Sequence, residues 1–117
     1  MDINVKKIKE NCFTDCYNIS LPLINNTQII GSLVFCNCVN IKQIIIGKNC
    51  LMIGSSAFRC CNSMHTVILN CEKPPMLANK LIIDDCPRFE FFVVNNRKLI
   101  INDHLAQPIW FDLKRYF

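Results

Sequence analysis

The chain has 117 residues, of which 51% are hydrophobic and 19% are charged. This composition is too apolar for a disordered tail and fits one compact domain. The formal net charge of +4 forms no continuous basic stripe along the sequence, so we expect no nucleic-acid partner. No apolar run approaches the ~20 residues of a membrane-spanning helix, and we expect no membrane span.

The number of cysteines is unusual. There are nine, an odd count, and residues 1–10, "MDINVKKIKE", carry lysines without the apolar stretch of a signal peptide. A secreted scaffold held by disulfides would show an even count and such a signal. We therefore expect reduced thiols and, from this feature alone, a cytoplasmic location.

A pattern of apolar residues and one cysteine recurs along the chain, beginning with "IKENCFTDCYNISLPL" at Ile8. Similar stretches begin at Ile30, "IGSLVFCNCVNIKQIII", and at Ile53, "IGSSAFRCCNSMHTVIL". The second and third stretches share the template I-x4-F-x2-C-x2-I-x2-I-x-I, with other apolar residues replacing some isoleucines in the third. A nearly constant period indicates that each copy is one unit of a stacked repeat protein.

The first and fourth copies also fit the template, but with residues missing or added. In the first copy we expect one residue to be missing between Ile19 and Leu21, so that Leu21 and Leu23 fill the last two positions. Since Pro22 cannot donate to a sheet, we expect this strand to lie at the sheet edge. Two extra residues are absorbed around "NCEKPP", and the fourth copy comprises Ala78, Ile83, Cys86, Phe89, Phe92 and Val94.

The period near 23 residues is typical of leucine-rich repeats, in which each unit contributes a short strand and a turn or short helix. "QIII", "TVIL" and "EFFVV" have high strand propensity and are expected to pair in parallel. We therefore predict a leucine-rich-repeat solenoid over residues 1–98, with about four stacked repeats, a short parallel β-sheet and turns or short helices on the outer side. The repeats lie near residues 8–29, 30–52, 53–77 and 78–98. Residues 99–117 are expected to cap the solenoid, with a short helix around residues 110–116.

The third copy also resembles a known family. Its phrase I-G-x-x-A-F-x-x-C-x-x-M-x-x-V-x-L, residues 53–69, is similar to the BspA-like leucine-rich repeats, also called the Treponema pallidum type. The resemblance covers roughly residues 8–94, and Pro74, Pro75, "FFVV" and Trp110 resemble the ending of that family. It implies a non-catalytic module that binds host, matrix or scaffold proteins, with an adhesive role at the cell surface.

Eight of the nine cysteines divide into two groups, and the ninth, Cys12, aligns with Val34 and Ala57 and is interpreted as a small apolar residue of the template. Cys16, Cys38, Cys61 and Cys86 share one template position, so we interpret them as a structural ladder of small, buried side chains that donate weakly to backbone carbonyls. Four others lie outside the template, namely Cys36, Cys50, Cys60 and Cys71. They leave open the alternative of a zinc-binding or redox protein. Their spacing is poor for zinc, and we expect no metal, no cofactor and no catalysis.

The template residues occupy the core, so function is expected on the outward side chains of the sheet. Because strand residues alternate, Ile45 faces outward between Ile44 and Ile46, with Pro22, Ile68 and Val93 as its counterparts in the other copies. The predicted binding face comprises Gln43, Ile45, Thr66, Ile68, Phe91 and Val93. An exposed apolar stripe of this kind marks a protein partner or self-association. The competing interpretation is that β-branched residues merely stabilise the sheet and that the tail covers them.

Overall fold

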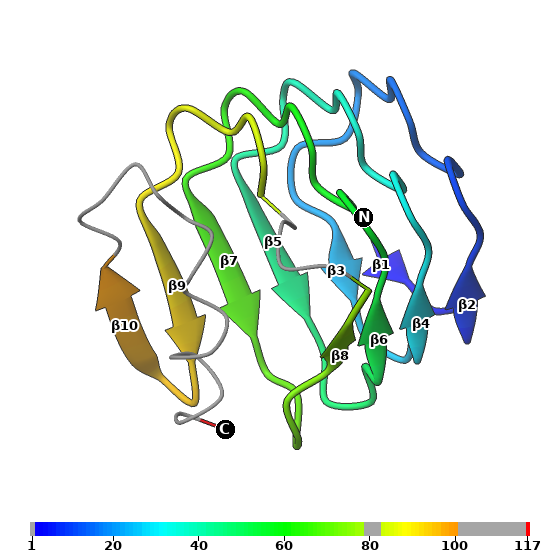
Figure 1. Cartoon of the computed structure of the whole chain (residues 1–117), viewed down its shortest axis with the longest axis vertical. Coiled ribbons are helices and arrows are strands. Elements are labelled where there is room, and N and C mark those ends of the chain that lie inside the picture. The colour runs from blue at the N-terminus through cyan, green and yellow to red at the C-terminus, as the bar shows by residue number, and fades with distance from the viewer. Residues whose placement is uncertain (1, 79–82, 101–116) are drawn as a thin grey trace.

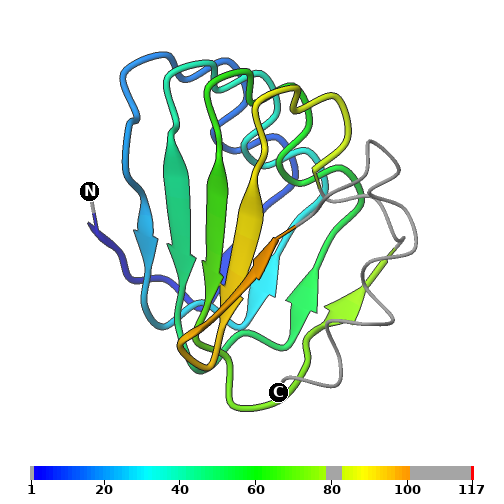
Figure 2. The same ribbon diagram turned by 90° about the vertical axis from the view of Figure 1, so that its left-hand side faces the viewer.

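The computed structural model describes residues 2–78, 83–100 and 117, and there the chain coils into a β-solenoid with two parallel sheets facing each other across one core (Figure 1). The major sheet has six strands, in the spatial order β1 (Asp2–Ile3), β3 (Leu23–Ile24), β5 (Gln43–Ile46), β7 (Thr66–Leu69), β9 (Phe91–Val94) and β10 (Arg97–Ile100). The minor sheet has four, in the order β2 (Lys7–Ile8), β4 (Ile29–Ile30), β6 (Met52–Ile53) and β8 (Met76–Leu77). One strand from each sheet makes one rung, and Figure 2 shows the sheets as the two sides of the coil.

This architecture confirms the predicted leucine-rich-repeat solenoid of about four repeats. Its outer side consists of turns and the minor sheet, and the described residues contain no helix. Each upper corner, which leads from the minor to the major sheet, holds residues in the left-handed region, such as Asn11, Leu33 and Ser56 with φ of 60°, 57° and 51°. A right-handed helix cannot contain such residues, which explains why the short outer helices are missing.

The first copy departs from the expected register. Leu23 pairs with Ile45 and Ile24 with Ile46, so no residue is missing after Ile19. Pro22 therefore stands opposite Ile44 and is buried, whereas the prediction placed it on the outward face. A one-residue slip moves every side chain of a strand to the other face, and the outward counterpart of Ile45 is consequently Leu23.

The position of this strand in the sheet was also predicted wrongly. β1 pairs with β3, so β1 is the edge strand and the first copy lies one strand further in. At the other end of the repeats, Ile53 pairs with Leu77, whereas Ala78 had been expected as its counterpart. The edge was misplaced because β1 has only two residues and lies outside the repeat template. The error at Leu77 is one of register, since a two-residue strand can satisfy the apolar template in two registers.

The core lies between the two sheets and is built from stacked template residues. Phe13 stacks on Phe35 with ring centroids 5.5 Å apart, and Phe35 on Phe58 at 6.0 Å. Phe35 and Phe58 are fully buried, and burying such a side chain contributes about 1.5–3 kcal/mol. The stabilisation therefore comes from contacts between rungs, because a single rung has no core of its own.

The C-terminal end of the major sheet departs from the parallel pattern. β10 pairs antiparallel with β9, with Lys98 opposite Val93. The expected boundary at residue 98 falls inside this strand. Residues 101–116, which hold most of the expected cap and its short helix, lie outside the described residues, whereas Phe117 packs against the core. The cap remains a prediction.

The two corners of each rung differ in how their length varies. The lower corner, at the bottom of Figure 1, connects the major to the minor sheet. It becomes one residue longer in each successive rung, running from Ile3 to Lys7, from Ile24 to Ile29, from Ile46 to Met52 and from Leu69 to Met76. The upper corners behave differently. Asp15 and Cys60 are left-handed residues at equivalent places in two upper corners, and Leu23 and Ile68 are the outward residues of the major strands that follow. The number of residues from Asp15 to Leu23 equals that from Cys60 to Ile68, so this spacing is constant.

Candidate functional site

The outward face of the major sheet carries a row of apolar side chains. The parallel register places Leu23 beside Ile45, Ile45 beside Ile68, and Ile68 beside Val93. All four side chains are half-buried. Ile45 and Ile68 each lie between two apolar neighbours, whereas Leu23 has Asp2 on its outer side and Val93 has Lys98. The structure thus brings three of the predicted face residues into one line and adds Leu23, which the incorrect register of the first copy had hidden.

A second row on the same face is more polar. Gln43 pairs with Thr66 and Thr66 with Phe91. Thr66 was expected to face solvent, but it is only 3% exposed. Its two strand neighbours flank it, and Nδ1 of His65 lies 2.7 Å from its hydroxyl oxygen, so that the hydroxyl has a partner in place of water. Gln43 and Phe91 are half-buried and remain accessible in part.

A cation marks the C-terminal end of this face. The ammonium group of Lys98 lies 4.1 Å from the centroid of the Phe91 ring, within the range of a cation–π interaction. This contact exists because β10 turns back antiparallel against β9, a feature for which the repeat pattern gave no signal. The apolar row therefore ends at a positively charged side chain.

The cysteine ladder has the geometry of a structural element. The Sγ of Cys38 donates to the carbonyl of Phe13 at 3.0 Å, and the Sγ of Cys61 donates to that of Phe35 at 3.2 Å. The Sγ of Cys86 donates to the carbonyl of Phe58 at 3.0 Å. Three of the four ladder thiols, those of Cys38, Cys61 and Cys86, thus bond to the preceding rung.

The backbone carbonyls of Phe13 and Phe35, which accept the ladder thiols, each accept a second hydrogen bond. The Phe13 carbonyl also accepts the backbone N–H of Cys16 at 3.1 Å, and the Phe35 carbonyl accepts that of Cys38 at 3.2 Å. One carbonyl therefore joins its own rung to the next. Burial raises the pKa of Cys38 to about 11, so its thiol stays protonated well above neutral pH. The pKa of Cys61 is also raised, through its hydrogen bond with Cys86 and by burial.

The cysteines outside the template are not gathered into a ligand set. Cys50 and Cys71 are each 2% exposed, and the pKa of Cys71 is raised by a hydrogen bond with Cys50 and by burial. Burial also raises the pKa of Cys36, to which nearby Cys60 contributes. Cys60, expected to face solvent, is half-buried. In the described part of the chain, no group of three or more such side chains could hold a metal ion.

The stacked rungs, their parallel strands and the buried template define the protein as a leucine-rich-repeat solenoid. The family model of the BspA type leucine-rich repeat region, described as six copies, matches residues 1–103, and the chain belongs to this family. Repeats of this kind generally mediate protein interactions and are typically non-catalytic. Neither the curated proteins nor the solved structures gave a match. Residues 2–78 and 83–100 include no helix that could cross a membrane.

Proposed function

We propose that this chain is a non-catalytic protein-binding module and that its partner binds the outward face of the major sheet. The observation that carries the proposal is the in-register row of Leu23, Ile45, Ile68 and Val93 on that face. These side chains lie outside the core between the sheets, yet they are apolar in all four of β3, β5, β7 and β9. Contiguous apolar side chains on an outward face are typical of interaction sites.

The chemistry of the face indicates what kind of partner it fits. The apolar row favours a partner with an extended apolar surface, and Lys98 beside Phe91 favours a carboxylate at the C-terminal end of that surface. Following the family resemblance, we propose that the partner is a host, matrix or scaffold protein and that binding serves adhesion at a cell surface.

The double substitution Ile45→Lys with Ile68→Lys tests this face. Both side chains are half-buried on the outward side, so lysines there can extend into solvent and the fold is expected to survive. Capture of partner proteins by the immobilised variant should be lost, and any self-association through this face should disappear on a sizing column. The matched control is Leu51→Lys with Met76→Lys on the side of the minor sheet, where both residues are exposed. Unchanged capture by the first variant, or equal loss in the control, would refute the proposal.

Thiol titration of the native protein separates this function from a metal- or thiol-dependent one. The ladder thiols Cys38 and Cys61 are fully buried and should react only after unfolding. Titration with and without a zinc chelator should give the same count of accessible thiols. One hyper-reactive thiol, or zinc released by the chelator, would favour the alternative.

A further inference from the structure

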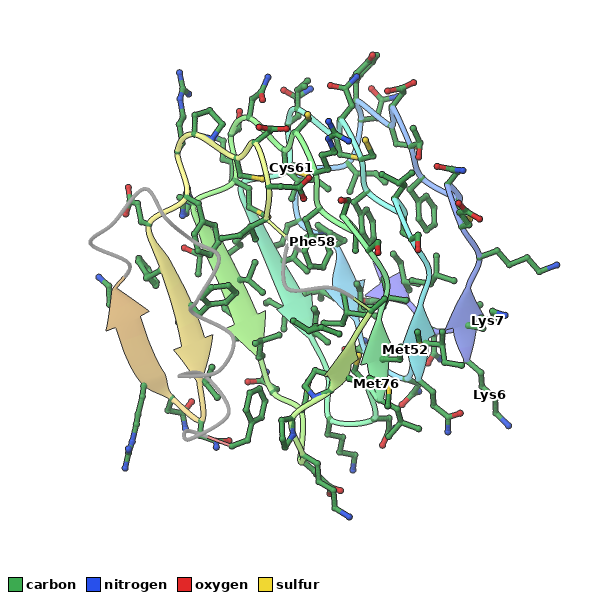
Figure 3. All side chains as sticks on the ribbon, viewed as in Figure 1. Lys6, Lys7, Met52, Phe58, Cys61 and Met76 are labelled. Carbon is green, nitrogen blue, oxygen red and sulfur yellow. The ribbon has the colours of Figure 1, made fainter. Side chains whose placement is uncertain are left out.

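The lower end of the solenoid carries apolar side chains that the core does not use. It consists of the lower corners and the first residue of each minor strand, namely residues 4–7, 25–29, 47–52 and 70–76. Three large apolar side chains are more than half exposed here, with 69% of Met76, 59% of Leu51 and 51% of Val5 accessible. Met52 pairs with Met76, and Figure 3 shows both on neighbouring strands of the minor sheet.

Hydrogen bonds between successive rungs hold these corners in place. The Nδ2 of Asn26 donates to the Oδ1 of Asn4, and the Nδ2 of Asn49 donates to the Oδ1 of Asn26 at 3.3 Å. The backbone N–H of Met76 donates to the carbonyl of Leu51 at 2.8 Å, so these two residues are neighbours. The lower end is therefore an ordered surface, on which the apolar side chains have defined positions.

The lower end is also basic. Its charged residues are all exposed and comprise four lysines and one glutamate, namely Lys6, Lys7, Lys48, Lys73 and Glu72. Figure 3 shows the side chains of Lys6 and Lys7 extending from the solenoid at β2. Within the part of the chain that the structure describes, none of these lysines forms an ion pair.

The rest of the described surface has no such excess of positive charge. Its upper corners carry both signs, with Lys9, Lys42, Arg59 and Arg88 against Glu10, Asp15, Asp84, Asp85 and Glu90. The strands of the major sheet add Asp2, Arg97 and Lys98. The exposed apolar side chains of the lower end therefore lie in the most basic part of the described surface.

We propose that the lower end binds an anionic membrane surface. Exposed apolar side chains beside lysines are the combination that binds a lipid bilayer at its headgroups, because the apolar groups enter the acyl boundary while the ammonium groups remain at the phosphates. Lysine side chains are long enough to lie along the apolar surface with their charge at the headgroups. A protein partner fits this end less well, since lysine is depleted at protein interfaces.

The architecture allows all four lower corners to contact one membrane at the same time. They lie together at one end of the two sheets (Figures 1 and 2), so the strands would stand on the bilayer. In this orientation the outward face of the major sheet remains accessible to a partner. The membrane surface proposed here is separate from the proposed binding face and does not rest on it.

Co-sedimentation of the full chain with lipid vesicles tests the charge contribution. The wild-type chain should bind vesicles of equal parts phosphatidylcholine and phosphatidylserine, should not bind vesicles of phosphatidylcholine alone, and should dissociate as the salt concentration rises. Lys48→Glu with Lys73→Glu should lower the partition coefficient about tenfold or more. Lys42→Glu with Arg88→Glu makes the same change in net charge at the upper corners, and this matched control should stay within about twofold of the wild type.

A second pair of variants tests the apolar contribution. Leu51→Asn with Met76→Asn should lower the partition coefficient severalfold, because less apolar surface enters the bilayer. The control is Tyr17→Asn, which removes an exposed apolar side chain on the way from the first upper corner to β3 and should leave binding unchanged. Circular dichroism of each variant checks that the fold is retained.

The outcomes are distinct. A wild-type chain that does not bind the phosphatidylserine vesicles at low salt overturns the proposal. Equal losses in the Lys42→Glu with Arg88→Glu control indicate attraction by net charge alone and also overturn it. Full binding by the Leu51→Asn with Met76→Asn variant contradicts the insertion of these side chains. If the variants of the lower end kept vesicle binding but lost capture of an acidic protein, this end would be a protein-binding site instead.

Discussion

Replacing Cys60 with asparagine should stabilise the protein. Cys60 has a φ of 58°, in the left-handed region that ordinary L-residues disfavour. The equivalent residues of the other upper corners are Asp15, Asn37 and Asp85, with φ of 62°, 59° and 57°. Asparagine and aspartate tolerate this conformation because their short polar side chains bond to the local backbone. Cysteine is therefore the exception at a position where the backbone favours asparagine.

The magnitude follows from the backbone conformation. A left-handed residue of ordinary type costs about 1–2 kcal/mol, and asparagine recovers part of this. The Cys60 backbone N–H donates to the Asp84 carbonyl at 3.1 Å, and the substitution leaves this bond in place. We expect a gain of about 0.5–1 kcal/mol in the free energy of unfolding. For a chain of this size, that is a rise of about 2–5 °C in Tm.

Thermal and urea unfolding, followed by circular dichroism, should rank the variants at this position. Cys60→Asn and Cys60→Gly should be more stable than the wild type, and Cys60→Ala should not be. Cys36→Asn is the control, because Cys36 is also half-buried but is not among the residues with positive φ. If Cys60→Asn were no more stable than Cys60→Ala, or if Cys36→Asn gave the same gain, the backbone argument would be wrong.

Three further predictions concern the core. A Cβ on Gly54 would lie 2.4 Å from the backbone nitrogen of Ser32, so Gly54→Ala should lower the free energy of unfolding by about 1–3 kcal/mol in urea titrations; an unchanged midpoint would contradict this close approach of rungs. Phe58→Ala should cost about 3–5 kcal/mol, and Phe13→Ala clearly less because Phe13 is half-buried; equal losses would be inconsistent with an open first rung. Since the folded state raises the Cys38 pKa from 9.0 to about 11, unfolding releases its proton above pH 9, and stability should fall between about pH 9 and pH 11. Cys38→Ala should flatten that fall in pH-dependent urea titrations.

The solenoid could be predicted from the sequence because the second and third copies agree at every template position. Phe35 and Phe58 recur together with Cys38 and Cys61, and all four are fully buried. In a stacked repeat, equivalent residues contact each other, so a period in the sequence becomes a contact in space. The same reasoning separated Cys61 from its neighbour Cys60, which lies at the left-handed position of the corner.

Features carried by very few residues could not be predicted. The minor sheet consists of two-residue strands such as Met52–Ile53, which are too short to show an alternating pattern. The rung formed by β1 and β2 holds only Ile3 and Ile8 as buried strand residues. In the first copy, Leu21 and Leu23 fitted the template as well as Pro22 and Ile24, and only the pairing with β5 decides between them.

The sequence predicted which residues form most of the candidate face, but it did not predict how exposed their side chains are. Strand alternation places Ile45, Ile68 and Val93 correctly in one row. Exposure depends on neighbours that are distant in sequence or unrelated to the template. His65 beside Thr66 and Lys98 over Phe91 both belong to this class, and neither occupies a position that the period defines.

The lower corners show where this scaffold tolerates change. Their length grows by one residue with each rung, from the segment after Ile3 to the segment after Leu69, while both sheets keep their register. The upper corners are held by left-handed residues and by the bonds from ladder thiols to carbonyls, and their spacing to the major strand does not vary. A foreign peptide or a fluorescent tag should therefore be inserted between Leu69 and Met76. The lower corners already differ in length from rung to rung within this chain. An insertion there would leave the outward face of the major sheet free for use as a display surface.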